Sequence, residues 1–475
     1  MVHSAKRWWA LGLIALAQFM VIMDTSIIGV ALPRMREDLG FSPGDLSWVF
    51  NAYVVAFGGL LLLGGRLSDL LGARRVFAAG WLILLAGSAV AGLAGTVGVE
   101  LAARAAQGAG AALIAPSALT LLMMLFGEKP AELTKALALY GAAAPAGGTA
   151  GVFLGGVITE YLSWPWVFYL NIPIAALALI ATPALMPAGG ARRGSLDVAG
   201  ALTVTAGLAT AVYGIVRAPE AGWGTTRTWA VLGGAVVLLA AFVLIQARRR
   251  EPLMRLAIFA NRELTAANVA QLLLGAAWIP MWFYLNLYLQ QVLGYRAFPS
   301  GAALLPMTVL IMIGMIALAP RVIARYGPGP ALVTGLAVLA AGLAWLALIR
   351  PTGSYLIDVL PASLVAALGM ALAFIPSLGT ALSAARPEEG GLAAGIVNTS
   401  YQVGSALGLA AMTALAAAHG ADELGNLPAL TDGYSAAFLG AAGVAAAAAV
   451  ISALSLRRRG ATTPAGAEPV GTHQI

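Results

Sequence analysis

Residues 8–32 read WWALGLIALAQFMVIMDTSIIGVAL, an apolar run interrupted by a single acid, Asp24. An α-helix rises about 1.5 Å per residue, so about 20 apolar residues cross the hydrocarbon core of a bilayer. The run is also too long for the apolar core of a signal peptide, and no convincing cleavage site follows it. Residues 8–32 are therefore predicted to form a retained membrane-spanning helix.

Similar runs recur along all 475 residues, of which 60% are hydrophobic and only 10% charged. Ordinary soluble domains carry about 25% charged residues. Backbone groups in lipid must be satisfied within their own segment, which favours helices. The chain is therefore predicted to be an all-α, polytopic membrane protein with fourteen spans, near residues 8–33, 46–65, 76–96, 99–125, 133–157, 165–186, 196–216, 229–247, 264–291, 299–322, 330–349, 354–383, 391–418 and 433–456.

The basic residues predict the orientation of these spans. With Lys6 and Arg7 in the cytoplasm, twenty of the 27 Lys and Arg fall in inner segments, six in outer segments, and Arg104 within a span. The positive-inside rule then predicts a multi-pass protein of the cell (inner or plasma) membrane with both termini cytoplasmic. The net charge of +7 is spread in short clusters between spans, which indicates membrane topology rather than nucleic-acid binding.

A weak internal repeat predicts the domain organisation. Residues 65–72 read GRLSDLLG and residues 320–327 read PRVIARYG, with Arg second and Gly eighth in both. The second and tenth spans become equivalent if the seventh and eighth are an insertion between two six-helix halves. The predicted parts are an N-terminal half at 1–190, two inserted helices at 191–255, a C-terminal half at 256–460 and a disordered cytoplasmic tail at 461–475.

Several kinds of chemistry find no support in the sequence. The chain has no cysteine, and His3, His419 and His473 fall in tails or loops, so neither a metal site nor a cofactor is predicted. The sequence offers no pairing of a nucleophile with a general base, as a membrane-embedded enzyme would need. No G-x-x-x-x-G-K-[ST] motif occurs, so the expected energy source is an ion gradient rather than ATP hydrolysis.

Five segments carry a family resemblance. Residues 65–75 (GRLSDLLGARR) and 101–110 (LAARAAQGAG) resemble the loop after span 2 and the span 4 motif of the major facilitator superfamily. Residues 23–33 (MDTSIIGVALP) resemble a segment of that superfamily's fourteen-span drug:proton antiporters, and residues 164–173 and 395–404 are similar to further stretches of the same family. The resemblance implies the major facilitator fold and export of small amphipathic compounds, such as antibiotics, in exchange for protons. A major facilitator importer of a metabolite is the alternative.

Four glycines of span 5 fit the antiporter motif. Gly147, Gly151 and Gly155 lie on one helix face, which allows close packing and sliding against a partner helix, although packing alone is the commoner meaning. Gly156 also fits the motif, whereas Val152 stands where the family has proline. The resemblance implies that this helix helps to seal the transport path on one side, and Val152 weakens the case for export.

The loop after span 2 is predicted to gate the inner face. Between Gly65 and Gly72, Asp69 can pair with Arg74, Arg75 or a helix terminus in one state and lose that partner in the other.

Buried charges are the candidates for proton coupling. An ionised Asp24 at its depth in span 1 costs at least about 2.5 kcal/mol unless it meets water or a partner, so burial favours the protonated form that a proton carrier needs. Arg104 in span 4 stays charged and is predicted to attract Asp24 only while Asp24 is ionised. A purely structural carboxylate and a Glu100–Arg104 pair are the alternatives. Asp358 is a second candidate proton or cation site, with snorkelling to the interface as the equal alternative.

Polar and aromatic residues within spans are predicted to line a central substrate cavity, because amides that face lipid would lack partners. Interfacial anchoring is the alternative for about half of the Trp and Tyr residues. The expected partners are a small amphipathic substrate, protons and the lipid bilayer, and an accessory periplasmic protein is left open. The cavity candidates are Gln18, Asn268, Gln271, Trp278, Trp282, Tyr284, Asn398, Tyr401 and Gln402.

Overall fold

The computed structural model describes residues 4–41, 48–188, 197–249, 252, 256–386, 389–421, 423 and 425–460. Every regular element within these residues is a helix. The all-α prediction is therefore confirmed for this part of the chain. The predicted C-terminal tail at 461–475 lies outside the described residues.

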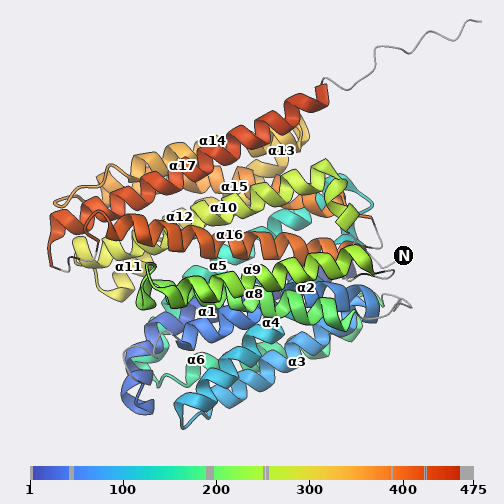
Figure 1. Cartoon of the computed structure of the whole chain (residues 1–475), viewed down its shortest axis with the longest axis horizontal. Coiled ribbons are helices and arrows are strands. Elements are labelled where there is room, and N and C mark those ends of the chain that lie inside the picture. Colours follow the sequence, from blue (N-terminus) through green and yellow to red (C-terminus); the bar gives the residue numbers. More distant parts are fainter. Residues whose placement is uncertain are drawn as a thin grey trace, which may run out of the picture.

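We describe the helices in three groups that follow one another along the chain (Figure 1). We call the first group the N-terminal bundle: α1 (Ser4–Leu39), α2 (Trp48–Leu71), α3 (Ala73–Gly92), α4 (Val97–Phe126), α5 (Pro130–Tyr161), α6 (Trp166–Tyr169) and α7 (Asn171–Leu185). The second group is a helical hairpin, α8 (Val198–Ala221) and α9 (Thr226–Arg248), followed by a short helix η1 (Leu256–Ala260). We call the third group the C-terminal bundle: α10 (Arg262–Leu287), η2 (Tyr288–Val292), α11 (Ala297–Ala303), α12 (Leu305–Ile313), η3 (Gly314–Leu318), α13 (Ala319–Tyr326), α14 (Pro328–Leu346), η4 (Tyr355–Val359), α15 (Leu360–Ser383), α16 (Gly390–Ala417) and α17 (Leu427–Gly460).

Twelve helical segments of the described residues are long and apolar enough to cross a membrane. Two predicted spans are not among them. Helix α8 offers only a shorter apolar segment, Ala199–Ile215, and α16 carries the polar sequence NTSYQ at 398–402, which lowers its hydropathy. Helix α8 nevertheless runs alongside α2 and α9, and α16 runs alongside α10 (Figure 1).

The two bundles repeat the same helix pairings. Helix α1 packs on α5 as α10 packs on α16, and α3 packs on α4 as α14 packs on α15. Glycines permit these close approaches: a Cβ on Gly147 would lie 2.3 Å from the Phe19 carbonyl oxygen, and one on Gly404 would lie 1.9 Å from that of Leu272. The repeated loops also match, because Gly72 and Gly327 link consecutive helices with positive φ angles of 90° and 85°, a conformation that favours glycine.

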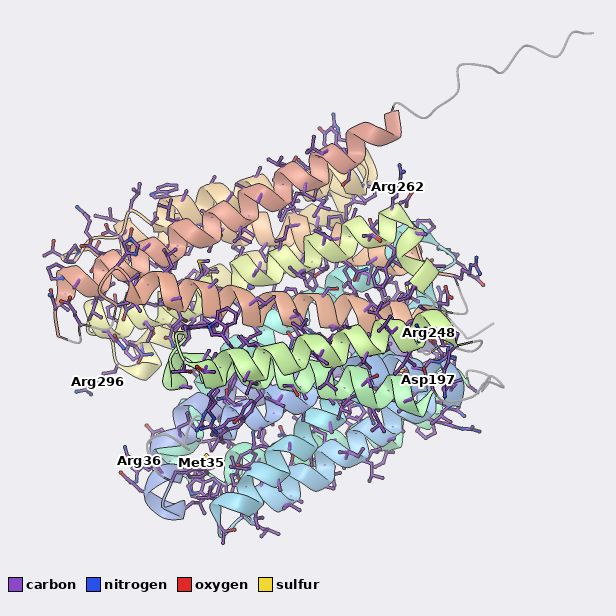
Figure 2. The ribbon with its side chains drawn as sticks, in the orientation of Figure 1. Met35, Arg36, Asp197, Arg248, Arg262 and Arg296 are labelled. Carbon is purple, nitrogen blue, oxygen red and sulfur yellow. The ribbon has the colours of Figure 1, made fainter. Side chains whose placement is uncertain are left out.

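The two ends of the molecule are marked by different charged residues. We call the end where α1 begins and α17 finishes the inner end, and Arg248 and Arg262 lie there (Figures 1 and 2). Arg36 and Arg296 lie at the opposite, outer end (Figure 2). Helix α1 extends to Leu39, beyond its predicted end at residue 33, and stops at Gly40, whose φ is 72°.

Contacts between the bundles run through a few helices. Helices α2 and α4 contact α16, and α5 contacts α12 and α15. Helix α8 packs against both α2 and α16, so the hairpin lies along one seam between the bundles (Figure 1).

Candidate functional site

A buried ion pair joins α1 to α4. Arg104 Nη1 donates to Asp24 Oδ2 over 2.6 Å, and both residues are 0% exposed. The predicted contact is therefore present, whereas its role in proton exchange stays a prediction. An ion pair out of water is stable only where further hydrogen bonds offset the desolvation of both charges.

Polar side chains from two more helices complete the shell around Asp24. Asn171 Nδ2 on α7 donates to Asp24 Oδ1 over 2.6 Å, and Gln107 Nε2 donates to the same oxygen over 3.3 Å. Ser88 on α3 accepts from Gln107 over 2.8 Å and from Asn171 over 3.2 Å. Asp24 is thus held by hydrogen bonds from α4 and α7. Ser88 on α3 helps to hold the two amide donors, Gln107 and Asn171, in place. The close approach needs small residues, since a Cβ on Gly87 would lie 2.9 Å from the Gln107 side chain.

The Arg104 side chain reaches α2 as well as Asp24. Its Nε donates to the Val49 carbonyl oxygen over 2.9 Å, and its Nη1 also donates to Gln107 Oε1 over 2.8 Å. The guanidinium carbon lies 4.7 Å from the centre of the Tyr53 ring and 5.9 Å from that of Phe168. A planar, permanently charged guanidinium suits such a site, because it donates in several directions and stacks on aromatic faces.

Glu100, the alternative partner of Arg104, is buried but makes no hydrogen bond to it. Thr96 caps the start of α4 by accepting from the Val99 amide, and this places Glu100 in the first turn of the helix. Glu100 is 0% exposed, yet neither carboxyl oxygen has a hydrogen-bond partner among the described residues. Arg104 instead binds Asp24 on α1, which ties two helices together.

The predicted gating loop is mostly helical, because Gly65 to Leu71 form the last turns of α2 and α3 begins at Ala73. This end of α2 meets the C-terminal bundle at the inner end. Asp69 accepts hydrogen bonds from the backbone amides of Gly391 and Leu392, over 2.8 and 2.9 Å. These amides begin α16, where unpaired N–H groups and the helix dipole attract an anion. The backbones also touch, because a Cβ on Gly65 would lie 2.4 Å from the Gly391 carbonyl oxygen. Of the partners predicted for Asp69, a helix terminus is thus present. Arg74 is half-buried and Arg75 is exposed in the next helix.

The glycines of α5 face the part of α1 that carries Asp24. A Cβ on Gly151 would lie 2.8 Å from the Met23 carbonyl oxygen, one turn beyond the contact of Gly147 with Phe19. Gly155 is buried farther along α5, whereas Gly156 has open space around it. The motif thus packs α5 against α1 on either side of the Asp24 turn.

The bundles also meet along α5, away from the Asp69 contact. The Thr149 and Thr308 hydroxyl oxygens lie 2.6 Å apart, so α5 is hydrogen-bonded to α12. Farther toward the outer end, a Cβ on Gly301 would lie 2.8 Å from the Val152 side chain. The two bundles therefore touch both at the inner end and toward the outer end.

Comparison with known proteins identifies the family of this chain. The model of the Major Facilitator Superfamily matches residues 14–409, which include the hairpin and most of both bundles but not α17. This chain belongs to the major facilitator superfamily. Among its relatives, the cephamycin export protein CmcT of Amycolatopsis lactamdurans is 38% identical over 93% of this chain and 91% of the relative. The puromycin resistance protein pur8 of Streptomyces alboniger is 38% identical over 94% of this chain and 91% of the relative.

A solved structure shows the same fold. The proton:xylose symporter XylE superposes with a TM-score of 0.67 at 14% sequence identity, covering 94% of this chain and 95% of that one. The all-helical major facilitator fold is therefore shown, and membership of this family implies a multi-pass membrane protein.

In this major facilitator protein, Asp358 is tied to a loop at the outer end. Arg350 donates to both carboxylate oxygens, over 2.7 and 3.1 Å, and the Ser354 amide donates over 2.7 Å. The hydrogen bonds to Asp358 and the charge of its carboxylate raise the pKa of the exposed Arg350 guanidinium, so it stays charged. Asp358, the fourth residue of η4, is thus bound to the residue before that helix and to the loop that leads into it.

Two of the predicted cavity residues lie where the bundles face each other. Gln18 Oε1 on α1 accepts from the Tyr140 hydroxyl on α5 over 2.7 Å. The next residue, Gly141, faces Phe374 on α15, because a Cβ there would lie 3.3 Å from its ring. Phe374 in turn lies 6.0 Å from Tyr401 on α16, edge to face.

The remaining candidates make their contacts inside the C-terminal bundle. Gln271 donates to Ser377, Tyr284 donates to Thr413, and Trp278 packs edge to face on Trp282. The amides of Asn268 and Asn398 donate to backbone carbonyls one turn earlier, and Gln402 is partly buried.

Sequence reasoning missed several residues of these sites. Gln107 lies three residues after Arg104, and Asn171 lies in residues 164–173. Both stand within the family segments quoted above, so their place in those segments could have suggested them. Ser88 and Tyr140 carried no such signal, since a serine or a tyrosine in an apolar span has many possible roles.

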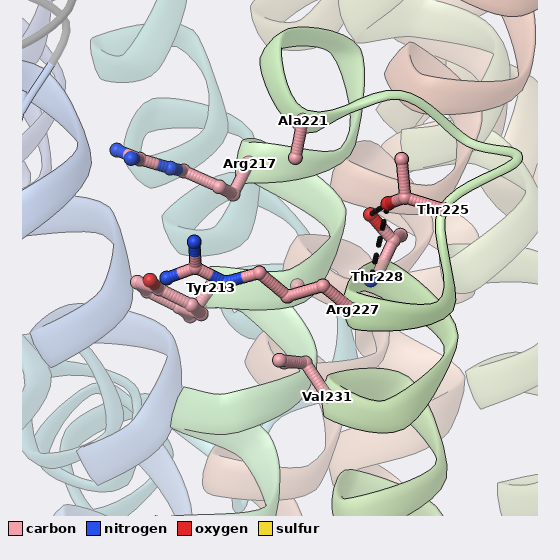
Figure 3. Close-up of a pocket in the computed structure, with 8 residues that line it drawn as sticks. Tyr213, Arg217, Ala221, Thr225, Arg227, Thr228 and Val231 are labelled. Atoms are coloured by element: carbon pink, nitrogen blue, oxygen red, sulfur yellow. Dashed lines mark hydrogen bonds between the residues drawn. The ribbon is translucent and has the colours of Figure 1, made fainter.

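A cavity of about 250 Å³ lies at the outer end of the α8 and α9 hairpin (Figure 3). Its lining includes Tyr213 and Arg217 from α8 and Arg227 and Thr228 from α9. The Arg217 guanidinium lies 5.8 Å from the Trp48 ring, one residue before the Val49 carbonyl that binds Arg104. The hairpin thus contacts the first turn of α2 beside the buried ion pair.

Proposed function

We propose that this protein exports small amphipathic compounds, antibiotics among them, across the cell membrane in exchange for protons. The buried Asp24–Arg104 pair carries the proposal, because it is an ionisable contact between two helices inside a transporter fold. The names of CmcT and pur8, which refer to cephamycin export and puromycin resistance, support the direction and the class of substrate.

The proposed coupling acts through the attachment of α1. An ionised Asp24 holds α1 to α4, and protonation removes the charge that attracts Arg104. Gly147 and Gly151 on α5 pack closely against this stretch of α1, so a shift of α1 also moves α5. Helix α5 in turn contacts α12 and α15 of the other bundle. The proton is thereby linked to the relative position of the two bundles.

The proposed substrate path lies between the bundles near Gln18, Tyr140, Phe374 and Tyr401. This group offers an amide, two hydroxyls and three aromatic rings, which suits a large and partly apolar ligand. Because Asp358 is bound by Arg350 and Ser354, we propose that it anchors the outer loop rather than carrying protons.

The experiment for this function is a drug-susceptibility panel in an efflux-deficient bacterium that expresses the chain. The panel should begin with puromycin and a cephamycin, because the names of the relatives pur8 and CmcT refer to these compounds. We expect raised resistance to at least one amphipathic compound and lower accumulation of it, reversed by a protonophore. Unchanged resistance, or increased accumulation, contradicts export and favours an importer.

For the topology, we propose fourteen spans, in which α8 and α16 also cross the membrane and α8 and α9 are inserted between two six-helix halves. The inner end then faces the cytoplasm. The chain has no cysteine, so Arg36→Cys and Arg248→Cys each create one reactive site. We expect a membrane-impermeant maleimide to label Arg36→Cys in intact cells and Arg248→Cys only after lysis. The reverse pattern excludes this orientation.

The Asp69 contact predicts a gating defect. Asp69→Asn keeps one acceptor oxygen but removes the charge, which at a helix N-terminus is worth about 0.3–1 kcal/mol or more when partly buried. We expect a several-fold lower transport rate with little change in ligand affinity, measured by efflux assays and binding to the purified protein. Glu37→Gln, at an exposed position on α1, is the control. Unchanged kinetics for Asp69→Asn would reduce the loop to a topological anchor.

A further inference from the structure

Glu100 is a buried acid that the coupling scheme leaves unused. It lies on α4 one turn from Arg104 toward the outer end, is 0% exposed, and has no hydrogen-bond partner on either oxygen among the described residues. Two further polar atoms nearby, Arg104 Nη2 and Asn171 Oδ1, are also buried without partners. The cluster formed by Asp24, Glu100, Arg104 and Asn171 therefore contains buried polar atoms without hydrogen-bond partners, in addition to the Asp24–Arg104 ion pair.

The charges around Glu100 come from two helices. Arg104 on α4 attracts its carboxylate and Asp24 on α1 repels it. Tyr53 on α2 packs on Arg104, and its hydroxyl donates to the Val21 carbonyl oxygen. Asp38, an acid nearer the outer end of α1, accepts from the Trp164 indole over 2.7 Å.

Charge balance limits the cluster to one carboxylate. Arg104 is already neutralised by Asp24, so an ionised Glu100 would be a second buried anion without a donor, which is strongly unfavourable. The cluster then holds one cation, one carboxylate and one neutral acid. The same balance is reached when the proton is on Asp24 and Glu100 is the carboxylate beside Arg104.

We infer that Glu100 is a second proton site of the exchange cycle, which holds a proton while Asp24 is ionised and becomes the counter-ion of Arg104 when that proton moves to Asp24. The O–H bond of Glu100 breaks, an O–H bond forms on Asp24, and Arg104 stays protonated, so the charge of the cluster is unchanged. Glu100 lies nearer the outer end, so a proton from that side reaches it first. An apolar cluster that includes Ile27, Val49, Trp164 and Phe168 packs in the outer part of the N-terminal bundle, and proton entry requires this cluster to open.

This inference rests on the proposed proton-coupled export, and Glu100→Gln tests it separately. Without Glu100 the protonated state of Asp24 leaves Arg104 without a counter-ion, so protonation of Asp24 becomes harder. Opposite charges at this range shift titrations by about 1–3 pH units. We expect the pH midpoint of gradient-driven puromycin transport in proteoliposomes to move to lower pH by about that amount, with energy-independent puromycin exchange retained. Glu100→Asp should restore most of the wild-type pH profile, and Glu37→Gln should leave it unchanged.

Each outcome of this experiment decides a different point. A wild-type pH profile for Glu100→Gln, while the wild-type protein still couples puromycin to proton movement reported by an internal pH dye, overturns the inference alone. Loss of exchange in both Glu100→Gln and Glu100→Asp assigns Glu100 a structural role and also overturns it. If wild-type protein moves puromycin without moving protons, the proposed function and the inference both fail.

Discussion

Asp24→Asn is expected to abolish uphill transport. The amide nearly matches the carboxylate in shape and can still accept from Asn171 and Gln107, but it cannot bind or release a proton in the accessible pH range. With one proton exchanged per substrate, a gradient of one pH unit corresponds to about 1.36 kcal/mol and an approximately tenfold concentration ratio. We expect wild-type proteoliposomes to approach such a ratio and the variant to stop at equal concentrations on the two sides.

Two further measurements make this result specific. Substrate-induced proton release should vanish in Asp24→Asn, whereas ligand binding should persist. Asp358→Asn is the matched control, because Asp358 is bound by Arg350 at the outer end, and it should keep gradient-driven transport. Full uphill transport by Asp24→Asn at native expression would remove Asp24 from the mechanism, and with it the proposed proton transfer between Glu100 and Asp24.

Arg104→Gln is expected to give the largest loss of stability. The substitution leaves Asp24 as a buried carboxylate without its counter-ion, and breaking one side of a buried pair costs about 3–5 kcal/mol. It also removes the hydrogen bond to the Val49 carbonyl oxygen on α2. The melting temperature of the purified protein in detergent should fall well below that of wild type.

The double variant separates charge imbalance from lost packing. Asp24→Asn combined with Arg104→Gln leaves no unpaired charge, so it should be more stable than Arg104→Gln alone, a positive coupling typical of residues in contact. Arg36→Gln, which alters an exposed arginine on α1, should leave the melting temperature unchanged. A double variant no more stable than Arg104→Gln would show that packing, rather than the ion pair, stabilises this position.

The sequence predicted the pair but only part of its surroundings. Asp24 and Arg104 stand out because burying a charge in an apolar span costs free energy unless an opposite charge lies beside it. Both residues also stand in the family segments. Ser88 is different, since serine is common in membrane helices and only the crossing of α3, α4 and α7 brings it beside Gln107 and Asn171. Tertiary packing, which no local pattern encodes, decided these contacts.

Of the fourteen predicted spans, twelve correspond to helical segments of the described residues that are long and apolar enough to cross a membrane. Hydropathy is a weak guide for α16, because polar residues at 398–402 lower its mean hydropathy. These residues can make contacts within the protein, as the Tyr401 ring does with Phe374. Asp358 shows another limit. From the sequence it could have been a proton site, but the turn that begins η4 brings the Ser354 amide and Arg350 onto the same carboxylate.

The contact between Asp69 and the start of α16 has an evolutionary consequence. The groups that receive this carboxylate are the main-chain amides of Gly391 and Leu392, which every residue except proline supplies. No compensating side-chain change at the two recipient positions can therefore restore a lost Asp69, as a charge swap could in an ion pair. Second-site revertants of Asp69→Asn should arise instead at positions that alter how closely α2 and α16 approach, such as the backbone contact at Gly65.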